Sequence, residues 1–334
     1  MQPTLNKVTI NQDNLSLIKE LLSELVLEPR LSLIKWSSLT HQTPNIKIGY
    51  PGQHLASLIT GVEGDRSGAR GHDLKDGTEV KSCSRIDQLD QCKACKYPVA
   101  RLEVNCANCG SDNIKRNNDS KWLFSVRSED ELTQLTGSIE RVLLMIGDYP
   151  NFDSGDYDTL RFQAFEIWPN HPRNSRFPEL ITNYYQKIYL EHKRKNSSSN
   201  PAPKNFWPYQ YQFYMCNPIK TFSATVANAG TVPEITIDYF VEPTSSREEL
   251  ASEMMPVGIL KKDELADLIS SASDEELSSL INKQLSPSEF RMLNIEEQAT
   301  NLSGIDEKLR AHLSLRDTDK ISVAKNAYAR RAIS

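Results

Sequence analysis

The sequence lacks an apolar run approaching the roughly 20 residues that a helix needs to cross a bilayer. Cysteine is sparse, with six in 334 residues, and no signal peptide is evident, so we expect a cytoplasmic protein with no membrane partner. An excess of positive charge is also missing, because the formal net charge is −5. A basic surface is the usual mark of a DNA-binding protein. If the protein binds DNA, its lysine and arginine residues must therefore be concentrated in a local patch.

The length allows a large core and more than one domain. We expect an N-terminal helical region over 1–45, a central core over 46–245 with an insert at 90–116, and a C-terminal helical domain over 246–334. From Ser246 onward the sequence becomes acidic and helical, with capping boxes that begin at Ser273 and Ser286. This region could serve dimerisation or DNA binding, and the sequence does not decide between them.

The stretch from 71 to 81 is dense in charged residues of catalytic type. The Asp76-Gly77 pair predicts a β-hairpin with a type I′ turn. Asp73 would then lie on one strand, with Glu79 and Lys81 on one face of the other. Two carboxylates can hold Mg²⁺ through hard oxygen ligands, and a nearby lysine can orient or deprotonate a water. These groups are suited to hydrolysing a phosphodiester.

This stretch resembles the catalytic motif of the PD-(D/E)xK nucleases, the fold of many restriction endonucleases. The resemblance implies that Asp73, Glu79 and Lys81 are catalytic. It further implies that Asp73, Glu79 and the backbone carbonyl of Val80 hold Mg²⁺.

The stretch departs from the usual motif in two ways. The proline that normally precedes the aspartate is His72 here, and the gap to the glutamate is short. Asp76 is therefore a rival for the first carboxylate, although we prefer Asp73 because the turn needs Asp76. In many of these enzymes a preceding helix supplies Glu or Gln to the site, and Gln53 is the matching type here.

Cys92-x-x-Cys95 and Cys106-x-x-Cys109 form a zinc-ribbon pattern, because four thiolates at such spacing bind Zn²⁺ in a closed, structural site. Two disulfides are the alternative. Cys83 and Cys216 remain, and they are expected to be partly buried.

The order of hairpin, ribbon, the strand at 121–126 and the stretch 212–218 resembles the MamI type of type II restriction endonuclease, from about Pro51 to about Val241. The resemblance implies an α/β (α+β) fold, with a PD-(D/E)xK mixed sheet flanked by helices. It also implies a homodimer that cleaves double-stranded DNA with Mg²⁺ at an interrupted palindrome, GATNNNNATC, and leaves 5′-phosphates. Another repair or recombination nuclease, a non-catalytic zinc-ribbon DNA-binding protein, and an adaptor with an acidic helical tail are the alternatives.

Local basic residues are the candidates for phosphate contacts: Arg66 and Arg70 in a glycine-rich loop, and Lys93 and Lys96 in the ribbon. The alternation over 205–214 predicts a strand, on which Gln210 and Gln212 could read adenine. The remaining expected elements are helices at 13–27, 51–60, 128–138 and 178–195, strands at 141–146, 161–168 and 234–241, and C-terminal helices at 247–255, 261–271, 305–313 and 319–332.

Overall fold

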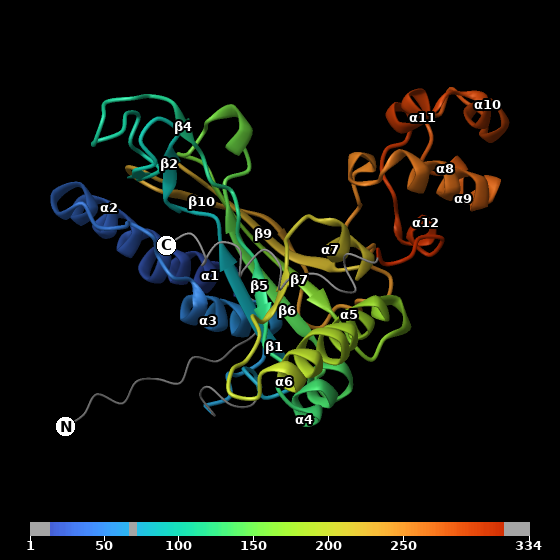
Figure 1. Cartoon of the computed structure of the whole chain (residues 1–334), viewed down its shortest axis with the longest axis horizontal. Helices are drawn as coiled ribbons and strands as arrows, with labels where there is room; N and C mark the ends of the chain where they lie inside the picture. The colour runs from blue at the N-terminus through green and yellow to red at the C-terminus, as the bar shows by residue number, and fades with distance from the viewer. Residues whose placement is uncertain (1–13, 67–71, 317–334) are drawn as a thin grey trace. The chain divides into compact units, whose positions relative to one another are not determined.

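The computed structural model describes residues 14–66 and 72–316. The chain forms two compact units, each assembled from separate segments (Figure 1). The first contains Met1–Trp122, Glu140–Glu166 and Lys220–Ser245, and the second contains Leu123–Ile139, Ile167–Ile219 and Ser246–Ser334. The division into three consecutive domains stays a prediction.

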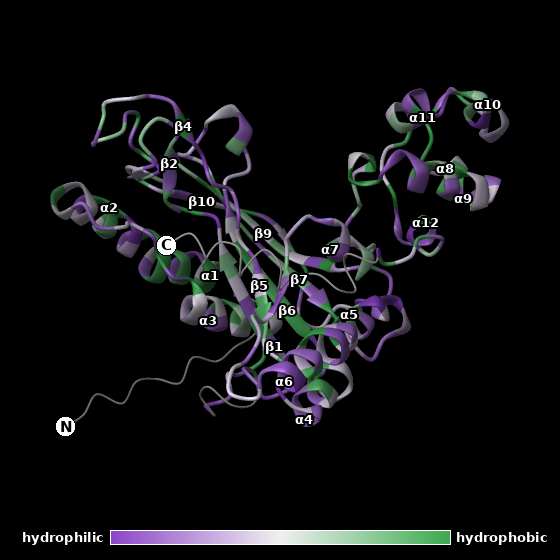
Figure 2. Cartoon of the chain, viewed as in Figure 1, coloured by the Kyte–Doolittle hydropathy of each residue, from purple (hydrophilic) through white to green (hydrophobic). Residues whose placement is uncertain are grey.

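A five-stranded mixed sheet forms the centre of the first unit, in the order β1-β6-β7-β9-β10. Its strands are β1 (Glu79–Ser84), β6 (Val142–Asp148), β7 (Leu160–Ile167), β9 (Ile219–Ala227) and β10 (Glu234–Phe240). β1 runs parallel to β6, and β10 runs antiparallel to β9. The apolar runs at 141–146 and 161–168 therefore form inner strands as predicted. β6 is buried along its whole length and largely hydrophobic (Figure 2).

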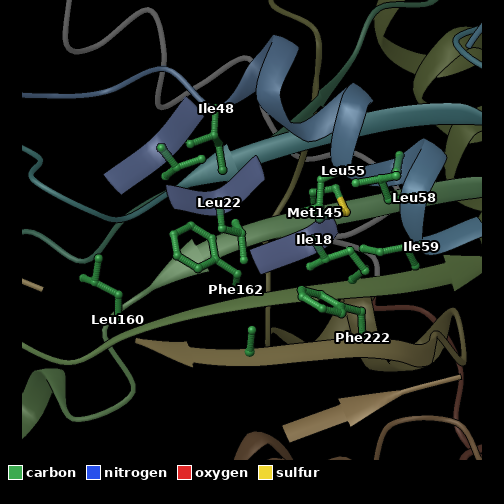
Figure 3. Packing of buried hydrophobic residues seen from close by; sticks show 14 of the residues in the cluster. Ile18, Leu22, Ile48, Leu55, Leu58, Ile59, Met145, Leu160, Phe162 and Phe222 are labelled. Carbon is green, nitrogen blue, oxygen red and sulfur yellow. The ribbon is translucent and has the colours of Figure 1, made fainter. Parts of the chain in front are cut away.

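The first 60 residues form α1 (Leu15–Leu22), a π-helical turn (Ser23–Leu27), α2 (Glu28–Thr40) and α3 (Gly49–Thr60). α1, the turn and α3 pack against the sheet, whereas α2 buries only Arg30. Figure 3 shows side chains of α1 and α3, such as Ile18 and Leu55, in one cluster with Met145 and Phe162 of the sheet. This cluster fixes α3 beside β1.

The first helix does not end before Pro29, as the sequence suggested, but continues through the π-helical turn into α2. Pro29 is the second residue of α2 and directly follows the π-helical turn, so the hydrogen bond lost with its N–H falls at the junction of the two helices. Asn14 does not cap α1 through its side chain. Its Nδ2 instead donates to the carbonyl of Leu58 at 2.9 Å, which ties the helix start to α3.

The ribbon insert forms a small sheet in the order β3-β2-β4. Its strands are β2 (Asp90–Cys92), β3 (Pro98–Val99) and β4 (Ile114–Lys115). The insert interrupts the chain between the neighbouring parallel strands β1 and β6.

The second unit contains a two-stranded sheet of β5 (Trp122–Phe124) and β8 (Lys204–Phe206). Its first helices are α4 (Glu129–Thr133), a π-helical turn (Gln134–Ser138), α5 (Arg176–Tyr184), a second such turn (Tyr185–Tyr189), α6 (Leu190–Lys195) and α7 (Tyr211–Met215). The rings of Phe124, Phe177 and Phe206 pack edge to face, with centroids 5.4–6.1 Å apart. The strand predicted over 205–214 is wrong beyond Phe206, because residues 211–215 form a short helix whose side chains are buried all round.

The C-terminal part of this unit is built from short helices. They are α8 (Lys262–Ser271), α9 (Asp274–Ser278), α10 (Pro287–Met292), α11 (Ile295–Asn301) and α12 (Glu307–Arg310). Short 3₁₀ turns span Phe152–Ser154 in the first unit and Pro172–Asn174 and Val257–Ile259 in the second. The capping boxes at Ser273 and Ser286 are confirmed. Asn294 and Glu297 form another capping box at the start of α11, a helix that was not predicted.

Two of the expected C-terminal helices need comment. The segment 247–255 is not helical, and Met255 at its end forms an antiparallel bridge with Ile305. The helix expected at 319–332 lies outside the described residues.

The architecture is a mixed α+β fold with a five-stranded sheet flanked by helices, which agrees with the expected restriction-endonuclease-like class. Among the residues that the structure describes, we find no helix of the length and hydropathy that a bilayer span requires.

Candidate active site and metal centre

Asp73 lies in a turn before β1 and not on a hairpin strand, so the predicted hairpin is wrong. The Gly77 N–H donates to the Leu74 carbonyl at 3.0 Å, which places the turn one residue earlier than expected. Only Gly77 has a positive φ (86°) here, whereas a type I′ turn needs two such residues. The edge strand β1 pairs with β6 from a distant part of the chain, so no second hairpin strand is required.

The turn nevertheless brings Asp73 to the outer edge of β1. The carboxylate accepts a hydrogen bond from Gln53 Nε2 at 2.6 Å and another from the Val80 N–H at 2.7 Å. Gln53 projects from α3, as the sequence suggested for an accessory residue. Gly52 allows this approach, because a Cβ there would lie 2.1 Å from Ser82 Oγ on β1.

Glu79 and Lys81 lie beside this carboxylate and form an ion pair with each other, with side chains 19% and 28% exposed. Burial raises the pKa of the Asp73 carboxyl. The Val80 N–H lowers this pKa, the charge of Glu79 raises it, and Lys81 lowers it. The two carboxylates are thus close enough to repel each other.

This group of oxygen atoms suits a divalent cation. The Glu79 N–H donates to the Arg141 carbonyl of the neighbouring segment, so the N–H and C=O of the next residue, Val80, point away from β6. The Val80 carbonyl therefore lies on the same side of β1 as Asp73. Two mutually repelling carboxylates and a carbonyl are hard ligands of the kind that Mg²⁺ takes.

Asp76, the rival carboxylate, is turned toward other partners. Its Oδ2 accepts from Arg141 Nη2 at 2.8 Å, and its Oδ1 accepts from the Thr78 N–H at 3.0 Å. The geometry thus favours Asp73 as the carboxylate that faces Glu79 and Lys81.

The four ribbon cysteines lie with all their sulfur atoms within 4.8 Å of one another. All are free thiols, and the Cys92–Cys109 and Cys95–Cys106 sulfur pairs are 3.6 and 3.5 Å apart. A tetrahedral site with metal–sulfur bonds of about 2.3 Å has sulfur atoms about 3.8 Å apart. The group is therefore able to hold a metal ion.

The two knuckles share one backbone conformation. Lys96 N–H donates to the Cys92 carbonyl at 2.9 Å, and Gly110 N–H donates to the Cys106 carbonyl at 2.8 Å. Lys96 and Gly110 both have left-handed φ values, 65° and 71°. In each knuckle the residue after the second cysteine closes the turn. In the first knuckle this residue is lysine, although the left-handed conformation favours glycine.

Arg101 anchors the ribbon, a role that the sequence did not reveal. Its side chain is fully buried and lies 3.1 Å from Asp90, which is also fully buried. The guanidinium carbon lies 4.9–5.5 Å from the ring centroids of Tyr149, Phe152 and Tyr157. An arginine from the insert thus packs into an aromatic cage provided by the segment between β6 and β7.

The candidate DNA contacts fall into different environments. Arg66, Lys93 and Lys96 are exposed, and Arg70 lies outside the described residues. Gln210 is exposed at the start of α7. Gln212 is buried, and its Oε1 accepts from Lys204 Nζ at 2.9 Å, which argues against a base-reading role.

Comparison with known proteins identifies the family. The family model for MamI restriction endonuclease matches residues 35–258, which is more than half of the chain and includes both the carboxylate cluster and the four cysteines. The type II restriction enzyme MamI of Microbacterium ammoniaphilum is 35% identical over 75 residues, which cover 22% of this chain and 24% of that enzyme. The chain thus matches about a quarter of the length of that relative. No solved structure matches. On the extent of the family match, the chain belongs to the MamI restriction endonuclease family.

Proposed function

We propose that the protein is a type II restriction endonuclease that cleaves double-stranded DNA with Mg²⁺ at an interrupted palindrome. The observation that carries this proposal is the position of Asp73, Glu79 and Lys81 together within the matched segment, at the edge of β1. A zinc-ribbon protein that only binds DNA would have no need for this cluster.

Asp73 and Glu79, with the Val80 carbonyl, would hold the metal. A bound Mg²⁺ would stabilise charge on the phosphate and lower the pKa of the attacking water. Gln53 fixes the Asp73 carboxylate by its hydrogen bond. The ammonium of Lys81, held by Glu79, is placed to position that water or to stabilise developing negative charge.

The ribbon would hold one structural Zn²⁺ through Cys92, Cys95, Cys106 and Cys109. Four thiolates form a closed coordination shell with no position for substrate, so the ion contributes to folding and not to hydrolysis. The exposed cations Arg66, Lys93 and Lys96 would contact DNA phosphates.

A palindromic site is read most simply by a two-fold symmetric protein, so the active form would be a homodimer. The site GATNNNNATC, 5′-phosphate products and action on DNA in the cytoplasm follow from the family resemblance.

Digestion of plasmid DNA tests the proposal. With Mg²⁺ the protein should give discrete fragments, and sequencing of their ends should reveal one interrupted palindrome with 5′-phosphates. Asp73→Ala and Lys81→Ala should abolish cleavage yet retain DNA binding. Lys75→Ala is the matched control, because Lys75 belongs to the same turn but pairs with Glu63.

Three results would count against parts of the proposal. Cleavage without discrete fragments would indicate a nonspecific or repair nuclease. Full activity of Asp73→Ala with an inactive Asp76→Ala would show that Asp76 is the first carboxylate. Absence of Mg²⁺-dependent cleavage in the wild type would leave a DNA-binding protein.

A further inference from the structure

Arg141, which directly precedes β6, makes three separate links to the segment that carries the carboxylates. Its side chain is nearly buried. Nη2 donates to Asp76 Oδ2 at 2.8 Å, and Nε donates to Thr78 Oγ1 at 2.9 Å. Its carbonyl accepts the Glu79 N–H at 2.9 Å. One residue thus holds both the turn and the start of β1.

These links reach Asp73 through the backbone. The Asp76 carboxylate that binds Arg141 also accepts the Thr78 N–H at 3.0 Å. The Thr78 carbonyl in turn accepts the Asp73 N–H at 3.1 Å. The position of the Asp73 backbone therefore depends on a continuous set of contacts that ends at the buried guanidinium.

We infer that Arg141 is a positioning residue, which acts through Asp76 to hold Asp73 at the edge of β1 opposite Glu79. The inference rests on the proposed function, because it assigns these carboxylates to a metal site. It explains why the turn is clamped: two carboxylates that repel each other move apart unless the backbone is fixed. A misplacement of about 1 Å in such a site costs on the order of 100-fold in rate.

Asp76→Asn and Arg141→Met test the inference. The contacts of the Arg141 side chain with Asp76 and Thr78 are called the clamp. Asp76→Asn weakens the clamp but leaves the 3.5 Å contact between Arg141 and the buried Glu166 in place. This variant therefore keeps the test valid if Arg141→Met fails to fold. Arg161→Met is the matched control. It removes an arginine that binds Asp148 through two hydrogen bonds, at the opposite end of β6.

Three quantities are measured: Mn²⁺ affinity of the DNA-free protein by calorimetry, the Mg²⁺ concentration for half-maximal cleavage, and the thermal unfolding midpoint. We expect both clamp variants to lose about 10-fold or more in Mn²⁺ affinity and to need correspondingly more Mg²⁺. They should regain part of the cleavage rate at high Mg²⁺. The control should lower the unfolding midpoint and leave both metal measurements unchanged.

The double variant Asp76→Asn/Arg141→Met separates a joint action from two independent effects. If Arg141 acts through Asp76, the loss of Mn²⁺ affinity should be no greater than that of Arg141→Met alone. Additive losses, or wild-type Mn²⁺ affinity in folded Asp76→Asn, would overturn the inference. If the wild type binds Mn²⁺ but cleaves no DNA, the proposed function fails while the Mn²⁺ measurements still decide the role of Arg141.

Discussion

Replacing Arg101 by methionine should destabilise the first unit substantially while leaving the metal ligands intact. The side chain is fully buried against Asp90 and three aromatic rings. Removing one partner of a buried ion pair costs about 3–5 kcal/mol, because the other charge is left without compensation. Asp90 would still be bound by Arg116 Nη1 at 2.8 Å and the Asn117 N–H at 2.7 Å. We therefore expect the lower end, about 3 kcal/mol.

Urea unfolding of the purified protein measures this change. Arg101→Met should lower the unfolding midpoint without altering the zinc content per chain, since the four cysteines are untouched. Lys93→Met is the control, because Lys93 is exposed in the same ribbon and its replacement should stay within about 0.5 kcal/mol. A midpoint for Arg101→Met as close to the wild type as that of the control would refute the reasoning that this arginine anchors the ribbon.

Further predictions concern the metal sites and DNA binding. In EDTA, the wild type should gain stability relative to the inactive Asp73→Asn as the pH falls from neutral, because burial and the charge of Glu79 raise the pKa of the Asp73 carboxyl. A raised folded-state pKa favours folding only while the group is protonated; urea melts of both proteins over a pH series measure the change, and a stability difference that does not depend on pH would contradict it. Cys106→Ser should lose the bound zinc and unfold more easily, whereas Cys216→Ser, at a buried cysteine outside the cluster, should keep the zinc; elemental analysis decides. Arg66→Ala should weaken binding to cognate and scrambled duplexes alike and reduce the salt slope by about one, and an unchanged slope would exclude a phosphate contact.

The sequence was sufficient to bring together residues that are close along the chain. Asp73, Glu79 and Lys81 lie within nine positions of one another, so both the predicted hairpin turn and the observed turn bring them together. The thiol knuckles are local for the same reason. The predicted hairpin was wrong because β1 pairs with β6, which follows the ribbon in the sequence. The turn residues before β1 give no information about a parallel pairing with so distant a strand.

The buried arginines were out of reach for a related reason. In a sequence, Arg101 and Arg141 read as two more exposed cations, since arginine is rarely buried unless it is paired. Their partners become neighbours only after the sheet has formed. The aromatic stretch 205–214 gave a wrong secondary structure for a different reason. All side chains of the short helix α7 are buried, so its sequence has no polar face, and an accidental alternation of residue types was interpreted as a strand.

The edge position of β1 has a consequence for solubility. An edge strand offers backbone groups to other chains, and proteins usually protect such edges. Here the Asp73 carboxylate accepts a hydrogen bond from the Val80 N–H, which points outward from the sheet edge. The side chain that we expect to bind the metal thus also blocks strand addition by another molecule. Among inactive variants, Asp73→Ala should therefore aggregate more readily than Lys81→Ala, which leaves that edge covered.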